Sequence, residues 1–185
     1  MRRTNVEIKA RCRDLQAARD RLAAAGARLE GTDLQTDTYF RVPQGRLKLR
    51  EGNIENALIF YRRPSQAAPK RSDVLLHPVA GGASLKAALA EALGVRVVVR
   101  KRREIYRLDN LKLHVDEVEE LGTFVEIEAI DADGQVGVER LTAQCGEWMD
   151  RLGVREDDLV DRSYADLLDG YSASGSDSNS GTSAT

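Results

Sequence analysis

The sequence predicts an α+β fold in which antiparallel strands form a closed or nearly closed β-barrel with helices packed outside. Most of the chain consists of short runs in which polar and apolar residues alternate, which is the period of a strand with one buried face. Other segments repeat apolar residues every three to four positions, as amphipathic helices do. Because several strands carry charge on their polar face, the helices are expected to cover the opposite, apolar faces.

Length and composition indicate one domain. The chain has 185 residues, of which 42% are hydrophobic, and this is enough for a substantial core. We place the domain at residues 1–170. Residues 171–185, rich in Ser and Gly, have almost nothing to bury and are expected to form a disordered tail. A net charge of −2 and 5% aromatic residues argue against a general binder of nucleic-acid duplexes or membrane surfaces.

The first half of the chain predicts two helices and five strands. Residues 14–25 place apolar side chains on one helical face, with Asp14 able to cap the start and Gly26 suited to the end. A second helix is expected to open at Ser84 and close at Gly94. The remaining elements are strands expected at 5–11, 34–42, 45–51, 56–64 and 70–79.

The second half predicts an antiparallel meander followed by helices. Its three alternating runs, joined by short turns, occupy 95–108, 111–121 and 123–130. An amphipathic helix follows at 138–152, and a short helix is expected near 164–169. The apolar side of the longer helix carries Leu141, Cys145, Trp148 and Leu152.

The polar faces of the strands are charged in step with one another. If the strands close into a barrel, these faces line a cavity rather than a packed apolar core, and a charged ligand is then expected inside. The basic members are Lys9, Arg11, Lys48, Arg50, Lys101, Arg103 and Lys112. The acidic members are Glu7, Asp116, Glu126 and Glu128.

The two signs of charge indicate a polyphosphate and a metal ion. Arg and Lys side chains grip phosphate oxygens, and Arg does so with two parallel hydrogen bonds. Carboxylates would repel phosphate unless a divalent cation such as Mg²⁺ or Mn²⁺ lay between them. The alternative from pattern alone is a two-layer sheet whose charged face meets water, because a single strand with this alternation is usually a solvated one.

The motifs resemble, in order and spacing, the CYTH superfamily of triphosphate tunnel metalloenzymes over roughly residues 5–168. The resemblance rests on VEIKAR, DTYF, GRLKLRE, YRRP, RKRREIY and HVDEVEELGTFVEIE. It implies an antiparallel eight-stranded tunnel with helices outside. The family includes class IV adenylyl cyclases and thiamine or inorganic triphosphatases.

The resemblance also implies roles for individual residues. Glu126 and Glu128 would hold the catalytic cation with Glu7, and Asp116 would assist as a ligand or orient water. The predicted catalytic residues are Lys9, Arg103 and Asp116. The residues predicted to bind triphosphate are Lys9, Arg11, Lys48, Arg50, Lys101, Arg103, Lys112 and either Arg62 or Arg63.

The N-terminal signature departs from the family pattern at its first acid. The signature is Glu-x-Glu-x-Lys, and the matching positions here are Asn5, Glu7 and Lys9. Asn offers an oxygen to a metal but adds no charge. The substitution leaves the number of bound metal ions open.

The resemblance implies a metal-dependent enzyme, of the bacterial cyclase-like branch, that converts ATP to cyclic AMP and pyrophosphate. The alternatives are a triphosphatase that hydrolyses the terminal phosphate of thiamine triphosphate or tripolyphosphate, and a non-catalytic triphosphate-binding protein. The start of the chain lacks the apolar region of a signal peptide, so we expect a cytoplasmic protein. Exposed apolar helix faces would allow a homodimer without requiring one.

Overall fold

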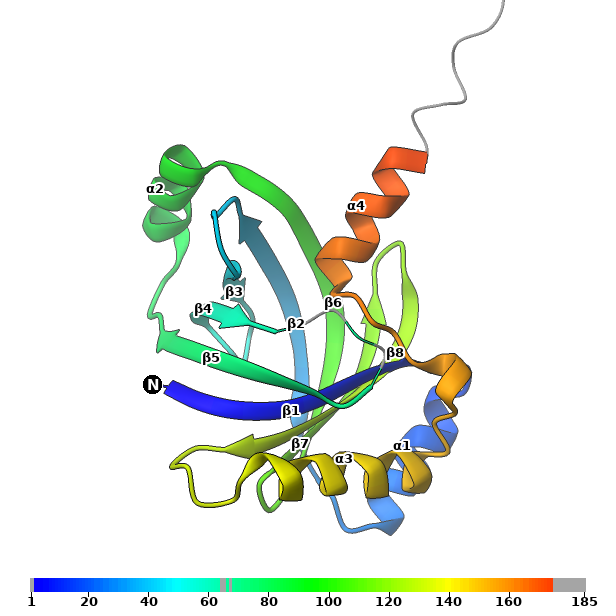
Figure 1. The fold of residues 1–185 in the computed structure, drawn as a ribbon. Coiled ribbons are helices and arrows are strands. Elements are labelled where there is room, and N and C mark those ends of the chain that lie inside the picture. Colours follow the sequence, from blue (N-terminus) through cyan, green and yellow to red (C-terminus); the bar gives the residue numbers. More distant parts are fainter. Residues whose placement is uncertain (1, 64–65, 67, 175–185) are drawn as a thin grey trace, which may run out of the picture.

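The structure is a computed structural model that describes residues 2–63, 66 and 68–174. In this part of the chain, eight antiparallel strands form a closed barrel with helices outside it (Figure 1). The strands are β1 (Arg2–Arg11), β2 (Arg28–Phe40), β3 (Arg46–Glu51), β4 (Ala57–Arg62), β5 (Lys70–Pro78), β6 (Val95–Leu108), β7 (Leu111–Val118) and β8 (Gly122–Asp131). The predicted fold class is therefore confirmed, and the two-layer sheet is not the arrangement observed.

The barrel closes because β1 pairs on both of its edges. It lies antiparallel to β5 on one side and to β8 on the other, in the order β1-β5-β4-β3-β2-β6-β7-β8. The register places Glu7 opposite Glu128 and Lys9 opposite Glu126. Because directly paired residues point to the same face of a sheet, these four side chains all point into the barrel.

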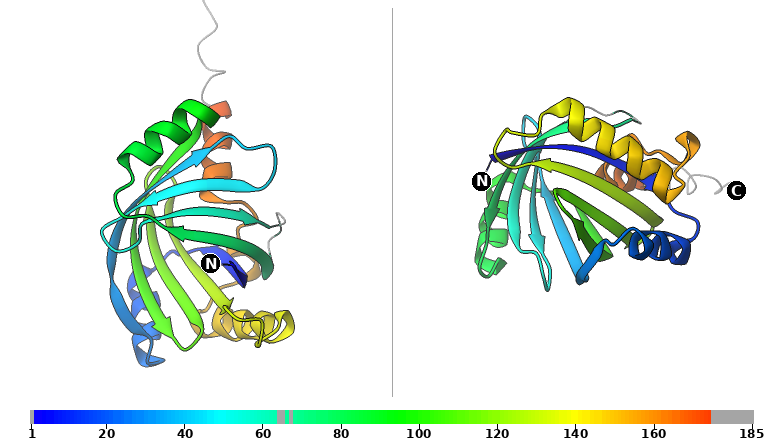
Figure 2. Two further views of the ribbon diagram at one scale, coloured as in Figure 1. Left: turned by 90° about the vertical axis from the view of Figure 1, so that its left-hand side faces the viewer. Right: turned by 90° about the horizontal axis from the view of Figure 1, so that it is seen from below.

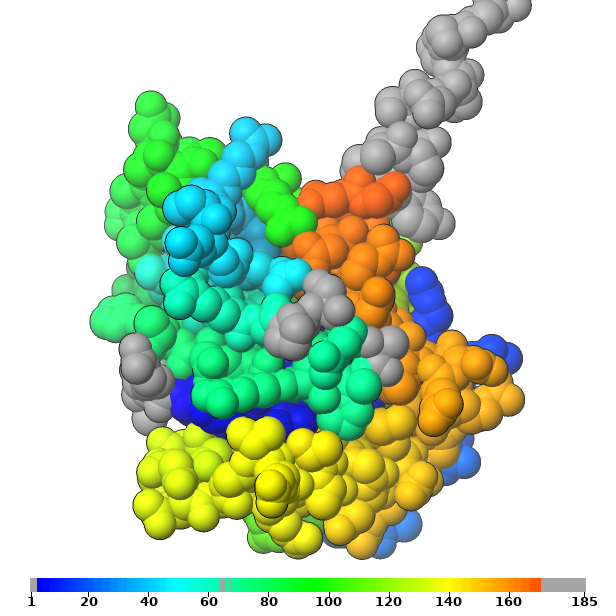
Figure 3. Space-filling view, in the orientation of Figure 1, coloured from blue at the N-terminus to red at the C-terminus, as the bar shows by residue number. Residues whose placement is uncertain are grey.

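The helices cover the outer surface unevenly. They are α1 (Leu15–Ala24), α2 (Ala83–Leu93), α3 (Val138–Leu152) and α4 (Tyr164–Ser174), with a short 3₁₀ turn at Glu156–Asp158. Helix α3 crosses β1 and β8 beside α1, as Figure 2 shows, whereas α2 stands at the far end of the barrel. On the face in Figure 3, the surface between α2, α3 and α4 is formed by β3, β4 and β5. Among the described helices, none has an apolar stretch long enough to cross a membrane.

The main hydrophobic core lies between the barrel and the helices α1 and α3. It combines the outward apolar side chains of β1, β7 and β8 with the apolar sides of both helices. Trp148 and Leu141 of α3 are buried in it, as the sequence predicts. The helices thus cover the apolar outer faces of these strands, and the charged faces line the interior.

Strand β2 begins six residues before the predicted start at 34. The pairing of β2 with β6 shifts register between Leu29 and Gly31, so Glu30 is the extra residue of a β-bulge. Gly31 has a φ of 149°, which favours glycine. The bulge breaks the polar and apolar alternation on which the prediction depends, and this is why the strand appeared to start later.

Helix ends agree with the prediction where a side chain makes the cap. Asp14 accepts a hydrogen bond from the Ala17 amide at the start of α1, as expected. Helix α2 begins at Ala83 after Gly82, without a side-chain cap, so the prediction that Ser84 opens it is wrong. Helix α4 continues to Ser174, so the first four residues of the predicted tail are helical. The rest of the tail, 175–185, lies outside the described residues.

Candidate functional site

The interior of the barrel is a cavity of about 380 Å³. Nine basic and five acidic side chains of the described residues line it. The basic residues are Arg3, Lys9, Lys48, Arg50, Arg63, Lys101, Arg103, Arg107 and Lys112. The acidic residues are Glu7, Asp37, Glu55, Glu126 and Glu128. The excess of positive charge makes the cavity attractive to a polyanion.

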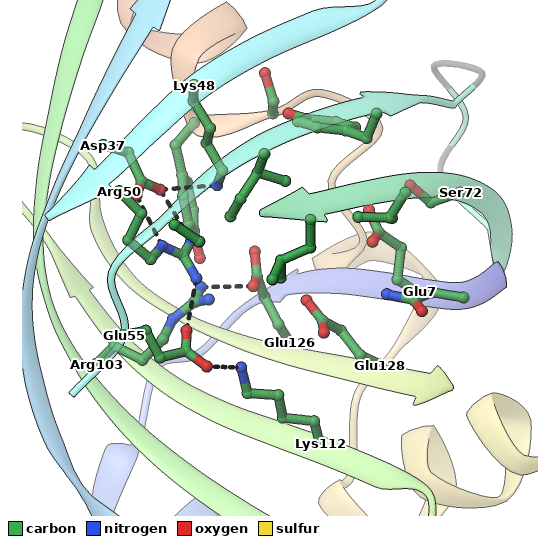
Figure 4. Close-up of a pocket in the computed structure, with 18 of the residues that line it drawn as sticks. Glu7, Asp37, Lys48, Arg50, Glu55, Ser72, Arg103, Lys112, Glu126 and Glu128 are labelled. Atoms are coloured by element: carbon green, nitrogen blue, oxygen red, sulfur yellow. Dashed lines mark hydrogen bonds and ion pairs between the residues drawn. The ribbon is translucent and has the colours of Figure 1, made fainter. Parts of the chain in front are cut away.

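Asp37 on β2 holds three of the cations together, and two of them, Lys48 and Arg50, are labelled beside it in Figure 4. Its Oδ2 lies 2.8 Å from Lys48 Nζ and 2.7 Å from Lys101 Nζ, and its Oδ1 accepts a hydrogen bond of 2.8 Å from Arg50 Nε. Burial alone would raise the pKa of Asp37, but the charges of Arg50, Lys101 and Lys48 outweigh it and hold the pKa well below its usual value. Three cations from two strands are thus fixed around one buried carboxylate.

Arg103 on β6 is held in a fixed orientation by two acids. Its Nε and Nη2 donate to the two oxygens of Asp116 at 2.7 and 2.5 Å, and Nη2 also donates to Glu126 at 2.6 Å. The Tyr164 hydroxyl donates to the same Asp116 carboxylate at 2.7 Å. Such a bidentate pair locks the plane of the guanidinium before any ligand arrives.

Lys9 lies between an acid and an aromatic ring. Its ammonium group forms an ion pair with Glu126 and sits 3.4 Å from the centre of the Tyr164 ring. Burial, followed by the charge of Arg63, lowers the pKa of Lys9 well below its ordinary value. Arg63, the residue after β4, in turn forms an ion pair with Glu7 on β1.

His114, Glu126 and Glu128 form a candidate metal site on β7 and β8. One ligand atom from each lies within 4.8 Å of the others. Within the described residues, His114 Nε2, Glu128 Oε2 and the nearby Asn5 Oδ1 are buried without hydrogen-bond partners. Buried polar atoms without partners are costly, and a bound divalent cation would satisfy them. The residues present therefore fit a metal ion.

The environment of His114 suits a metal ligand. Burial lowers the pKa of its imidazole well below the ordinary value, and the neighbouring cations Arg103 and Lys112 lower it further. The ring is therefore neutral at neutral pH, which is the form that binds metals. The other ring nitrogen, Nδ1, lies 3.3 Å from Glu126 Oε2.

The structure brings most of the predicted site residues together. Those that line the cavity are Glu7, Lys9, Lys48, Arg50, Arg63, Lys101, Arg103, Lys112, Glu126 and Glu128. Of the alternatives Arg62 and Arg63, regular alternation turns Tyr61 and Arg63 inward, while Arg62 is exposed and hydrogen-bonded to Gln44. No bulge is needed to place Arg63 in the cavity.

Two other predicted residues lie outside the cavity lining. Arg11 is exposed, donates to the carbonyl oxygen of Leu121 at 3.2 Å and rests over the Phe124 ring. Asp116 is fully buried behind Arg103, and its oxygens accept hydrogen bonds from Arg103 and Tyr164. Asp116 is thus placed to orient Arg103, while its predicted role as a metal ligand stays a prediction.

Several residues of the site are not among those predicted from the sequence. Asp37 lies in the quoted DTYF motif but received no role, although it shares strand parity with Tyr39, which also lines the cavity. Glu55 lies in the turn between β3 and β4, where alternation gives no information. Tyr164 reaches the cavity from the start of α4, which no local pattern indicates.

The cavity opens to solvent beside β4 and β5, where its lining turns aliphatic. Ile54 and Pro78 line the cavity and are themselves exposed, which marks the opening. Ala57 pairs with Pro78, and Ile59 pairs with Leu76 in the register of these two strands. The opening thus offers an apolar surface next to a charged interior.

A closed barrel with a basic interior and a cluster of acids defines a triphosphate tunnel. The family model described as the CYTH domain matches residues 3–164, and the chain belongs to this family. The resemblance seen in the motifs is thereby confirmed.

The relatives are distant but cover nearly the whole chain. The protein "Putative adenylate cyclase MJ0240" of Methanocaldococcus jannaschii is 24% identical over 171 residues, 88% of this chain and 97% of that protein. The structure of PH1012 from Pyrococcus horikoshii superposes with a TM-score of 0.77 at 24% identity, over 88% of this chain and 98% of that one. HpAC1 from Hippeastrum is described as an adenylyl cyclase candidate with a dominant triphosphatase activity. It superposes with a TM-score of 0.58 at 16% identity, over 92% of this chain and 96% of that one. At these identities the structural likeness concerns the fold.

Proposed function

We propose that the protein is a metal-dependent enzyme that acts on a nucleoside triphosphate, as a class IV adenylyl cyclase-like lyase that forms cyclic AMP and pyrophosphate from ATP. The observation that carries this proposal is the convergence, in one cavity, of the basic cluster around Asp37 with the acid group at Glu128. The basic cluster is suited to phosphate oxygens, and the acid group to the cation that accompanies them.

The aliphatic opening favours an organic triphosphate over an inorganic one. Ala57, Ile59, Leu76 and Pro78 form a continuous apolar lining at the solvent end of the cavity. Inorganic tripolyphosphate has no apolar part to bury there, whereas a nucleoside does. A nucleoside at the opening would leave its phosphates directed toward the basic interior.

The metal would be Mg²⁺ or Mn²⁺, held by Glu126, Glu128 and His114 with Asn5 close by. Bound there, it would neutralise charge on the phosphate oxygens and thereby lower the barrier to attack. Glu7 is paired with Arg63 in this structure, so its predicted part in the metal site stays a proposal.

The residues of the chain supply alignment and charge. In the proposed reaction the ribose 3′-hydroxyl releases its proton to water and its oxygen bonds to the α-phosphorus, while the bond from that phosphorus to the α,β-bridging oxygen breaks and pyrophosphate leaves. Arg103, held by Asp116, and Lys101, held by Asp37, are fixed donors for the developing negative charge. Lys9 forms an ion pair with Glu126 of the metal group and would contact the reacting phosphate.

The second candidate function is triphosphate hydrolysis, in which water attacks the terminal phosphate in the same cavity. The description of HpAC1 shows that a protein of this fold can carry a cyclase name and a dominant triphosphatase activity. The test is incubation of the purified protein with ATP and Mg²⁺ or Mn²⁺, with separation of the products. Cyclic AMP with pyrophosphate supports the cyclase, and orthophosphate without cyclic AMP supports the triphosphatase.

Glu128→Ala separates a catalyst from a protein that only binds. A catalyst should lose turnover by about a hundredfold or more while it retains measurable affinity for the triphosphate, because the basic cluster is intact. Glu117→Ala, on the exposed side of β7, is the control and should keep full activity. A wild-type protein that binds ATP and forms no product from it would be the non-catalytic binder instead.

A further inference from the structure

Glu55 differs from the other acids of the cavity in its origin. Glu7, Asp37, Glu126 and Glu128 project from barrel strands, whereas Glu55 belongs to the turn between β3 and β4. It nevertheless reaches the lumen, where it accepts a hydrogen bond of 2.8 Å from Arg50 and forms an ion pair with Lys112 (Figure 4).

The turn is shaped to deliver this carboxylate. Asp33, fully buried on β2, accepts hydrogen bonds from the Ile54 and Glu55 amides at 2.9 and 3.0 Å. These bonds fix the backbone, so the side chain of Glu55 points from β3 toward β7. The strand order separates β3 from β7 by β2 and β6, and the contact with Lys112 therefore crosses the interior of the barrel.

The contact occupies two cations that a phosphate chain would need. Lys112 on β7 has Glu55 as its ion-pair partner among the described residues. Arg50 keeps a second partner, since its Nε and Nη2 donate to Asp37 at 2.8 and 3.0 Å. Removal of Glu55 would leave Arg50 in place and free both cations for an incoming anion.

Glu55 can also move at a lower cost than Asp37. The side chain of Asp37 is 1% exposed and holds three cations, whereas that of Glu55 is 25% exposed. Its neighbours in the turn, Asn53, Ile54 and Asn56, are exposed, and Ile54 and Asn56 line the cavity. Side chains on an exposed turn rearrange more readily than those packed on barrel strands.

We propose that Glu55 is a built-in competitor of the substrate: its carboxylate holds Arg50 and Lys112 in the empty tunnel, and a phosphate group displaces it on binding. The inference rests on the proposed function, because the displacing ligand is a triphosphate. Glu55 keeps two like charges neutralised when the tunnel is empty, and it lowers the affinity for triphosphate in return. It thereby sets the concentration range in which the site fills.

The test measures tripolyphosphate binding by isothermal titration calorimetry, at low salt and with EDTA so that no divalent cation takes part. Glu55→Gln removes the charge and keeps the size. The variant should bind at least about threefold more tightly than wild type, because the ligand no longer displaces a charged group. The matched control is Glu51→Gln, which removes an acid paired with Lys86 on the outer side of β3 and should bind within about twofold of wild type.

If wild type binds tripolyphosphate and Glu55→Gln binds it equally or more weakly, the inference is overturned and the proposed function stands. In a second titration with Mg²⁺ in place of EDTA, weaker binding by Glu55→Gln that is seen only there would assign Glu55 to the metal instead. If Glu55→Gln fails to fold by circular dichroism, Glu55→Asp retracts the carboxylate by one methylene and should still bind more tightly than wild type. Wild type that binds no triphosphate, with or without Mg²⁺, would contradict the proposed function itself.

Discussion

Asp37 shows at the scale of one residue how the tunnel tolerates its charge. Three cations this close together would repel one another, and the single carboxylate among them offsets this repulsion. The sequence placed Lys48, Arg50 and Lys101 correctly because strand alternation is sufficient to orient them. It did not show which acid they share, because Asp37 lies on β2, and the pairing of β2 with both β3 and β6 is not visible in any single strand.

Asp37→Asn should destabilise the protein by about 3–5 kcal/mol at pH 7, because the buried Arg50 and Lys101 and the half-buried Lys48 lose the carboxylate that they share. The folded-state pKa of Asp37 is depressed, so its stabilising effect is present above the unfolded pKa of about 3.9 and is lost as pH falls below that value. Urea unfolding of both proteins should therefore show a gap that narrows below about pH 4. A gap that stays constant down to pH 3 would contradict this role.

Arg62 and Arg63 form a natural pair for testing which side of β4 meets the ligand. Arg63→Ala should weaken triphosphate binding by about tenfold or more, because Arg63 lines the cavity beside Glu7. Arg62→Ala should change binding by less than about twofold, because Arg62 is exposed on the outer face. Equal losses in both variants would show that the strand does not have this orientation in solution.

At the scale of elements, prediction succeeded where one local pattern decides the outcome. Helix α3 has the predicted bounds because Trp148 and its apolar neighbours repeat on one face over four turns. Strand β6 also matches, although both of its faces carry charge. Prediction failed at the β2 bulge, where Glu30 breaks the alternation, and in the turn of Glu55, whose position depends on the buried Asp33.

Packing of α3 on the barrel is testable through Trp148. Trp148→Ala should reduce the free energy of unfolding by about 3–5 kcal/mol, because it leaves a cavity between α3 and the outer face of the barrel. The neighbouring exposed residue provides the control, and Glu147→Ala should change stability by no more than about 0.5 kcal/mol. Urea denaturation gives both values. A loss below about 1 kcal/mol for Trp148→Ala would argue that α3 is not a main part of the core.

At the scale of the whole molecule, the barrel places its apolar core outside and its charge inside. The helices α1 and α3 bury the outer face of β1, β7 and β8, so the interior is left for ligands. This inversion follows from strand closure, which converts charged strand faces into the wall of a cavity. The alternating faces indicated it from sequence, but closure itself depends on β1 pairing with both β5 and β8, which no single strand reveals.

The central claim is that this cavity holds a phosphate chain on its basic wall and a divalent cation at its acid group. The most direct measurement is a crystal structure with Mn²⁺ and tripolyphosphate, with the metal located by its anomalous scattering. We expect the Mn²⁺ peak beside Glu126, Glu128 and His114, and phosphate oxygens within hydrogen-bond distance of Arg103 and Lys101. Tripolyphosphate bound on the outer surface of the barrel, or Mn²⁺ located away from these acids, would contradict the account.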